Sequence, residues 1–315
     1  MASEFERIAM LQALFGKAPD DISLGIGDDA AIISPRDRSR DLVWTIDSFV
    51  QDVHFRADLM GWYDVGWRSL MTAASDLAAM AAVPMGALAA IVLPASFPDD
   101  DLLAIGRGQA DASRSIGTAV VGGNLSRGSE VSIATTLIGS VAASVRRDGA
   151  RPGHVLAVCG VIGLAAAGLR LLMQHPDDVP QDLDALEAIQ AFRRPSARIS
   201  DGLRCAGVAS SLIDVSDGLA QDAGHIAEAS RVRIDIDLDA VLDDRLVRLA
   251  ARLGIDAADL ALHGGDDYAL LATMPPDALP EGFVAIGRCV HGQGVWIAGS
   301  DRRLDARGHD HFRSA

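Results

Sequence analysis

The sequence predicts an α+β protein made of two domains of similar size, and three observations support this. With 315 residues, the chain is longer than a typical single domain. Strand-like and helix-like apolar segments are mixed along it, without the strict alternation of a parallel doubly wound sheet. A polar, turn-rich segment at 146–153 separates the halves. We therefore place the domains at residues 1–148 and 149–315.

The elements of the first half follow from local residue patterns. Helical spacing is clearest at 64–80, where Val65, Leu70 and Ala73 can share a buried stripe. Acidic residues open the helix at 99–116, where they suit the positive end of its dipole. The strands are short apolar runs. This half is predicted to contain helices at 4–15, 64–80 and 99–116 and strands at 30–33, 42–46, 87–93 and 131–141.

The second half begins with a strand and a helix joined by the glycine-containing segment 159–163. Further apolar runs alternate irregularly with segments of helical spacing. Low-complexity tracts and a convincing internal repeat are missing from the sequence. This half is predicted to contain strands at 155–158, 212–214, 232–238, 268–273 and 283–290 and helices at 164–173, 219–230 and 243–253.

Composition excludes several classes of partner. A net charge of -15 argues against nucleic acid or an anionic membrane, because either needs clustered Lys and Arg. An anionic substrate is still possible through metal ions. Cys159, Cys205 and Cys289 have no paired spacing and are expected to be buried thiols in a reducing compartment. The acidic start of the chain does not resemble a signal peptide, so a cytoplasmic protein is expected.

One segment imitates a membrane span. Residues 77–98 carry no charge and are long enough to cross a bilayer. The segment is broken by Pro84, Gly86 and Pro94. It is therefore better divided into a helix end, a turn and a strand.

Carboxylates beside glycine or at the ends of apolar runs are the main chemical signal. Asp28 and Asp29 follow a glycine-containing turn, Asp47 ends an apolar strand, and Asp76 lies within an apolar run. An irregular loop can direct adjacent carboxylates to cations, although Gly-Asp-Asp alone is more often an ordinary turn. A carboxylate in an apolar run is costly unless it is paired or bound to metal. These positions predict a site for hard cations and phosphate.

Two further segments add phosphate and cation ligands. Gly122 and Gly123 can direct backbone N–H groups at phosphate oxygens, and Asn124 offers a neutral oxygen; a simple strand connection explains them equally well. Asp214 and Asp217 bracket Ser216 just before a helix, where helix capping and metal binding are compatible.

Histidine and nucleophile motifs give no competing site. His54 is more often a packed side chain than a catalyst. The sequence has no His-Glu-x-x-His, Cys-x-x-Cys, Gly-x-Ser-x-Gly or Walker-type loop. Hydrolase triads, zinc sites and ordinary nucleotide-binding loops are therefore disfavoured.

Together and in order, these segments resemble the thiamine-monophosphate kinases of the aminoimidazole-ribonucleotide-synthetase-like superfamily. The resemblance runs almost the full length, and its specificity comes from order and spacing. It is carried by Gly25 to Ala30, Asp47 with His54-Phe55, Ser75 to Met80, Gly122-Gly123, Arg194-Pro195, Ser216 to Leu219, Asp222 with Gly224 to Ile226, Gly264-Gly265 with Asp267-Tyr268, and Asp310 to Phe312.

The resemblance implies a two-domain PurM-like fold that phosphorylates thiamine monophosphate with ATP and several Mg²⁺ ions. It also implies a homodimer whose N-terminal sheets form an intersubunit β-barrel. That N-terminal domain would bind ATP and Mg²⁺. No general base is implied, because a phosphate acceptor is already ionised near neutral pH; Asp47 and Asp217 would position metal. The implied sites are metal at Asp29, Thr45, Ile46, Asp47, Asp76, Asn124, Asp214 and Asp217, ATP at Gly122, Gly123, Arg147 and Ser216, and substrate at His54, Asp266 and His309.

Three positions depart from the family's pattern. Asn124 stands where the family usually has Asp, Asp266 where it has Glu, and His309 where it has another aromatic residue. They leave one alternative: a catalytically weakened homologue that binds nucleotide and metal. Two related enzymes fit less well, because no cysteine precedes Cys159, as selenophosphate synthetase would require, and none ends the chain, as a hydrogenase-maturation carbamoyl dehydratase would require.

Overall fold

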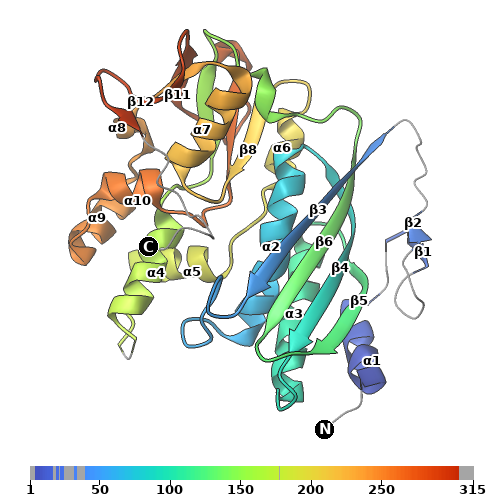
Figure 1. Ribbon diagram of the computed structural model, residues 1–315. Coiled ribbons are helices and arrows are strands. Elements are labelled where there is room, and N and C mark those ends of the chain that lie inside the picture. The colour runs from blue at the N-terminus through green and yellow to red at the C-terminus, as the bar shows by residue number, and fades with distance from the viewer. Residues whose placement is uncertain are drawn as a thin grey trace. The chain divides into compact units, whose positions relative to one another are not determined.

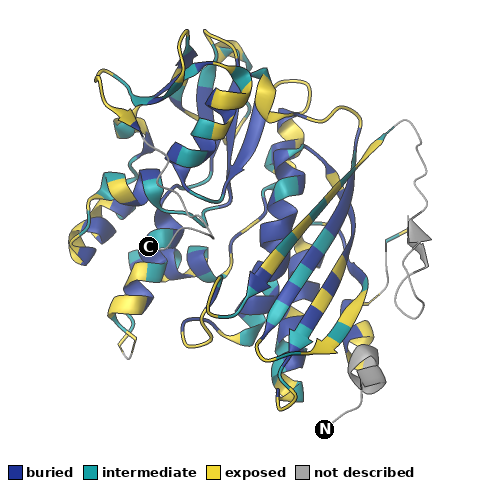
Figure 2. Ribbon diagram, viewed as in Figure 1, coloured by how far each residue is buried: buried dark blue, intermediate teal, exposed yellow. Residues whose placement is uncertain are grey.

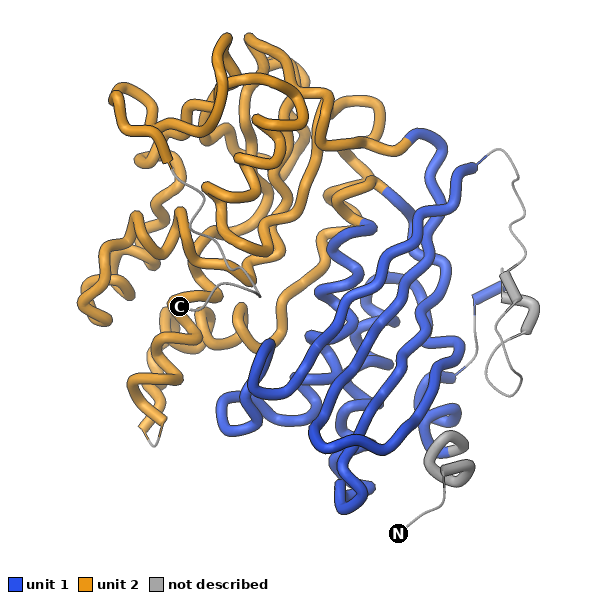
Figure 3. Tube along the Cα trace, in the orientation of Figure 1, with its two compact units in different colours: residues 1–77, 82–143 blue, residues 78–81, 144–315 orange. Residues whose placement is uncertain are grey.

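The computed structural model describes residues 4–16, 19–20, 22–24, 32–33, 40–176 and 178–304. The chain divides into two compact units, shown in Figure 3. Unit 1 comprises Met1–Leu77 and Ala82–Ala143, and unit 2 comprises Ala78–Ala81 and Ser144–Ala315. The main division therefore falls a few residues before the boundary at residue 148 that the sequence suggested.

Unit 1 is built around a four-stranded sheet in the order β3-β6-β4-β5 (Figure 1). Its neighbours are antiparallel except for β4 and β5, which are parallel. A separate two-stranded pair, β1 and β2, precedes it. The elements are α1 (Glu4–Phe15), β1 (Ile22–Leu24), β2 (Ile32–Ile33), β3 (Asp41–Val50), α2 (Trp62–Ala79), β4 (Val83–Leu93), α3 (Asp99–Ser115), β5 (Val120–Arg127) and β6 (Ser132–Val141).

The two faces of this sheet differ in character. Helices α2 and α3 lie along one face (Figure 1), and residues of β6 that point toward them, such as Thr135 and Leu137, are fully buried. Burial alternates along β3, as expected for a strand with one covered face. Figure 2 shows the resulting bands of exposed residues on the outer face. Thr45 and Asp47 lie on the inner face and Trp44 and Ile46 on the outer face.

Glycine lets α2 and α3 approach closely. A Cβ added at Gly66 would lie 2.0 Å from the Ile105 carbonyl oxygen, and one added at Gly108 would lie 2.0 Å from the Tyr63 carbonyl oxygen. Any side chain at either position would therefore push the two helices apart. This contact fixes the helix that carries Asp76.

Unit 2 contains a seven-stranded sheet in the order β13-β12-β9-β11-β7-β10-β8. All of its neighbours are antiparallel except β12 and β9. The strands are β7 (Val155–Cys159), β8 (Ser211–Val215), β9 (Arg233–Ile236), β10 (Ala269–Met274), β11 (Val284–Val290), β12 (Gly294–Ile297) and β13 (Arg303–Leu304). The helices are η1 (Arg147–Gly149), α4 (Leu164–Gln174), α5 (Leu183–Arg193), α6 (Ile199–Cys205), α7 (Leu219–Ser230), α8 (Leu238–Val241), α9 (Asp244–Leu253), α10 (Ala257–His263) and η2 (Pro276–Ala278).

The core of unit 2 is apolar along its central strands. Every residue of β8 and β10 is buried. The three cysteines are free and buried, as the sequence predicts, and burial raises the pKa of Cys205 and Cys289 to about 12. The thiols thus act as small apolar side chains.

The uncharged segment at 77–98 is not a membrane span. It contains the end of α2, a turn and β4, as predicted. None of the helices in the described part of the chain is long and apolar enough to cross a membrane. The strand predicted at 30–33 is described only at Ile32–Ile33. The elements that were not predicted are β1, β5, β12, β13, α5, α6, α8, α10, η1 and η2.

Candidate functional site

In unit 1, the last turn of α2 brings Asp76 to the inner face of β3. The Thr45 hydroxyl donates a short hydrogen bond to Asp76 Oδ2. The fold thus joins two residues that are far apart in the chain, and their role as metal ligands stays a prediction. Asp76 also lies near the negative end of the helix dipole, which disfavours a carboxylate. A cation bound there would offset that penalty, so the donor set fits Mg²⁺.

Asp47 and Asn124 lie at opposite edges of the four-stranded sheet. Asp47 is aligned with Gly123 through Thr135 and Ala89, and three strand spacings of about 4.8 Å separate them by about 14 Å. Asn124 is next to Gly123, on the outer face. One ion cannot contact Asp47 and Asn124 in the same chain. The Asp47 carboxylate accepts a 2.8 Å hydrogen bond from the Ser48 backbone N–H.

The glycine pair in this sheet belongs to a strand. Gly122 and Gly123 lie within β5 and pair with Leu88 and Ala89 of β4. A Cβ at Gly123 would lie 1.9 Å from the Ala89 carbonyl oxygen, so glycine is needed for strand approach. The structure thus explains Gly123 by packing, and the role of both glycines toward ATP stays a prediction.

Four other predicted site residues, His54, Ile46, Asp29 and His309, add little to the geometry of the site. His54 follows β3, and its Nδ1 accepts a 3.1 Å hydrogen bond from the Val50 backbone N–H. Its ring lies 6.1 Å from that of Phe49, which is the packed arrangement common for histidine. Ile46 directs its side chain to the outer face, so only its backbone is available on the Asp47 side. Asp29 and His309 lie outside the described residues.

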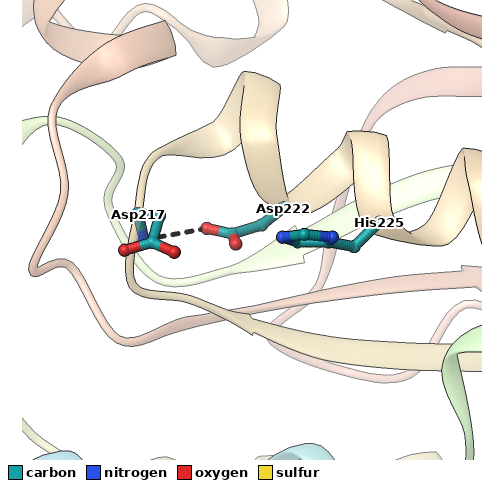
Figure 4. A group of neighbouring side chains, drawn as sticks. All are labelled: Asp217, Asp222 and His225. Atoms are coloured by element: carbon teal, nitrogen blue, oxygen red, sulfur yellow. Dashed lines mark hydrogen bonds between the residues drawn. The ribbon is translucent and has the colours of Figure 1, made fainter. Parts of the chain in front are cut away.

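In unit 2, Asp222 organises the loop that carries Ser216 and Asp217. Asp222 Oδ2 accepts hydrogen bonds of 3.1 Å from both backbone N–H groups of that loop. Gln221 donates a 3.0 Å bond to Asp217. Figure 4 shows Asp217 in the loop and Asp222 with His225 on α7, their side chains in a row. One ligand atom from each of these three residues lies within 4.8 Å of the other two.

This group concentrates negative charge. Burial first, and then the charges of Asp217 and Asp214, raise the pKa of Asp222 to about 7. Asp214 is itself 6% exposed within the wholly buried strand β8. Buried carboxylates close to one another are expensive without positive charge. The carboxylates of Asp214 and Asp217 therefore suit a hard divalent cation.

A second loop, 264–268, lies directly against the first. The Asp266 backbone N–H donates a 2.8 Å bond to the Ser216 carbonyl, and the Tyr268 N–H donates one of 2.8 Å to Val215. The Tyr268 hydroxyl is 3.2 Å from Asp266 Oδ1. A Cβ at Gly265 would lie 2.4 Å from the Ser216 carbonyl oxygen. The structure thus brings the loop with Ser216 and Asp217 against Asp266, and their roles toward metal, ATP and substrate stay predictions.

Arg147 lies in the short helix η1 and is exposed. Its carbonyl oxygen accepts a 2.9 Å bond from the Ser230 hydroxyl at the end of α7. That hydroxyl also accepts a 3.0 Å bond from the Ala150 N–H. Ser230 therefore fixes the backbone that presents Arg147.

Sequence reasoning did not assign a role to Asp222, His225 or Asp267. The signal for Asp222 was present, because it comes one helical turn after the Ser216–Gly218 segment and is the acidic residue of the first turn of α7. Asp267 gave no separate signal beside Asp266. Its contacts with residues about a hundred positions away could be seen only in the folded chain.

Two sequence comparisons identify relatives of this chain. The family model of the AIR synthase related protein, N-terminal domain, matches residues 27–141. A thiamine-monophosphate kinase from Mycobacterium tuberculosis is 37% identical over 281 residues, covering 88% of this chain and 82% of that protein.

Two solved structures are similar over nearly the whole chain. The thiamine-monophosphate kinase from Stenotrophomonas maltophilia K279a has a TM-score of 0.84 and 36% identity, covering 95% of this chain and 98% of that one. AaThiL complexed with AMPPCP and TMP has a TM-score of 0.82 and 32% identity, covering 91% of this chain and 93% of that one. Sequence and fold therefore indicate the same relatives.

Proposed function

The chain belongs to the thiamine-monophosphate kinase family, and from this we infer that it catalyses the ATP-dependent phosphorylation of thiamine monophosphate to thiamine diphosphate. The observation that carries this inference is the near full-length similarity to a protein seen with AMPPCP, an ATP analogue, and TMP. The two-sheet α+β architecture is the PurM-like fold of that family. The enzyme is thus a kinase with a phosphate group as acceptor.

We propose that catalysis depends on alignment and charge neutralisation. The acceptor phosphate is already ionised near neutral pH, so a terminal oxygen can attack the γ-phosphorus of ATP in line without a general base. The bond from the γ-phosphorus to the β–γ bridging oxygen breaks, and ADP leaves with its electron pair. The dominance of carboxylates supports this mechanism. Bound Mg²⁺ supplies the positive charge that lets two anionic substrates approach acidic residues.

Several side chains are proposed to hold that Mg²⁺. In unit 1 the described ligands are Asp76, which is hydrogen-bonded to Thr45, and Asp47 with the backbone of Ile46. Asn124 serves a separate ion, because three strand spacings place it about 14 Å from Asp47. Asp29 completes the unit 1 set by resemblance. In unit 2 the ligands are Asp214 and Asp217, whose loop is fixed by Asp222.

Substrate contacts are proposed on the same basis. Ser216 and Arg147 contact ATP, with Gly122 and Gly123 as further contacts. His54, Asp266 and His309 contact thiamine monophosphate. The Asp266 backbone N–H donates a 2.8 Å hydrogen bond to the Ser216 carbonyl. This bond supports the assignment, because it places a residue proposed for thiamine monophosphate next to a residue proposed for ATP.

A homodimer is proposed from the outer face of the unit 1 sheet. Trp44 and Ile46 are 68% and 67% exposed, and Leu42 and Leu88 are also exposed. Ile46 and Leu88 lie in one row across β6. Several exposed apolar side chains on one sheet face are typical of an interface, and an intersubunit barrel made with a second copy would cover them.

The function is tested by incubating purified protein with ATP, MgCl₂ and thiamine monophosphate and measuring thiamine diphosphate. The kinase is expected to form product only when all three are present. The alternative, a weakened homologue, is supported by Asn124, Asp266 and His309, and it predicts nucleotide and metal binding without turnover. Binding of both substrates with no product would therefore replace the kinase proposal with that alternative.

A further inference from the structure

Asp267 fastens the 264–268 loop to a different part of unit 2. Its Oδ2 accepts a 2.6 Å hydrogen bond from the Gly163 backbone N–H, and its Oδ1 accepts one of 3.2 Å from Ala165. These donors belong to the cap and first turn of α4. Both carboxyl oxygens are therefore engaged with the N-terminus of one helix, which favours an acidic side chain.

Asp267 has no direct role in the proposed chemistry. Both of its oxygens point at backbone amides, and the carboxyl is withdrawn from water although the residue keeps some exposed surface. Its neighbour Asp266 is one of the residues proposed to contact thiamine monophosphate. The two adjacent acids thus have separate tasks.

The backbone of this loop needs an anchor. Asp266 and Tyr268, on either side of Asp267, have φ values of 69° and 48°, a left-handed region that non-glycine residues rarely adopt. Such conformations persist only when surrounding contacts hold them. One side of the loop is held by its bonds to Ser216 and Val215, and Asp267 holds the other.

We propose that Asp267 is a positioning residue for thiamine monophosphate binding, which sets the backbone that presents Asp266 by clamping the 264–268 loop to the N-terminus of α4. This inference rests on the proposed function. The Ser216–Asp217 loop has its own anchor in Asp222. Loss of the Asp267 clamp therefore affects the acceptor substrate more than ATP.

The test compares steady-state kinetics of the full-length wild type with the variants Asp267→Asn and Asp267→Glu. Asn offers one acceptor oxygen and places an NH₂ donor against a backbone N–H. Glu keeps both acceptor oxygens on a longer side chain. Asp182→Asn is the matched control, because Asp182 accepts a 3.3 Å bond from Ala185 at the start of α5, and α4 and α5 both contain 11 residues.

We expect Asp267→Asn to raise KM for thiamine monophosphate about tenfold, an order-of-magnitude value for one misplaced hydrogen-bonding group, with less than a twofold change in KM for ATP. Asp267→Glu should lie between wild type and Asn, and the control should match wild type. An unchanged KM for thiamine monophosphate, or an equal rise in both KM values, overturns the proposal. If Asp267→Asn does not fold, the same comparison of KM for thiamine monophosphate with KM for ATP is made on Asp267→Glu.

A second measurement separates this inference from the proposed function. If the wild type forms no thiamine diphosphate, the proposed function fails. Amide hydrogen exchange then tests the clamp: Asp267→Asn should accelerate exchange at Gly163, Ala165 and Asp266, and Asp182→Asn should not. Unchanged exchange at these amides would overturn the clamp whatever the reaction.

Discussion

At the residue scale, hydrogen bonds between separate segments hold the carboxylates of both units in place. Thr45 and Asp76, and Ser216 with Asp266, are joined by hydrogen bonds in the folded chain. Asp222 was visible in the sequence as part of a resemblance, yet its function as the acceptor for two loop amides depends on tertiary geometry. Single-sequence patterns report residue type and spacing, whereas hydrogen-bond partners distant in sequence require the fold.

Asp222 should make the stability of the metal-free protein depend on pH. Its pKa is raised from 3.8 to about 7 in the folded state, so between these values the folded chain holds a proton that the unfolded chain has lost. The stabilising contribution of Asp222 to the unfolding free energy is complete below about pH 4 and is lost as pH rises through about 7. The unfolding free energy then falls by at most about 1.4 kcal/mol per pH unit. Urea unfolding in EDTA at pH 5 and pH 8 measures it.

The comparison with Asp222→Asn isolates this carboxyl from other titrating groups. The wild type should lose more unfolding free energy than the variant between pH 5 and pH 8. Equal losses in the two proteins would show that Asp222 does not retain the proton.

At the element scale, long periodic segments were predictable and short or glycine-containing ones were not. Helices α1 and α7 have the predicted bounds, and β4 and α2 were correctly separated within an uncharged segment. Strand β5 was missed because Gly122-Gly123 resembles a turn, while the structure uses Gly123 for close approach to Ala89. A glycine is often required because the backbone of a distant segment packs against it, and the local sequence does not show that contact.

The α2–α3 contact provides a stability prediction at this scale. Gly108→Ala places a methyl group where a Cβ would be 2.0 Å from the Tyr63 carbonyl oxygen. The expected cost is about 1–3 kcal/mol of unfolding free energy. Gly224→Ala in α7 is the control, since a Cβ there meets nothing within 4 Å. Similar denaturation midpoints for the two variants would rule out a tight helix crossing at Gly108.

At the scale of the whole molecule, composition and the order of motifs predicted the class, and the fold and the family similarity agree with it. The two sheets and the apolar outer face of unit 1 could not be derived from the sequence, because strand order depends on contacts between distant segments. The sequence also could not show that Asp47 and Asn124 lie at opposite edges of one sheet.

The outer face of unit 1 predicts an oligomer that one substitution disrupts. Trp44→Glu places a charge on a side chain that is 68% exposed, so it should not disturb the core. Sedimentation equilibrium should give a dimer for wild type and a shift toward monomer for the variant. Leu183→Glu, at a side chain of unit 2 that is 70% exposed, is the control and should leave the dimer unchanged. A monomeric wild type would contradict the proposed interface.

The most direct test of the central claim is thiamine diphosphate formation by wild type and Asp47→Asn, with ATP and thiamine monophosphate, as MgCl₂ is titrated. The wild type should form product only with the divalent cation. Asp47→Asn should keep the wild-type circular dichroism spectrum and lose about 100-fold or more in turnover, equivalent to about 2.7 kcal/mol. Absence of product from the wild type, or near-normal turnover by the variant, would contradict the account.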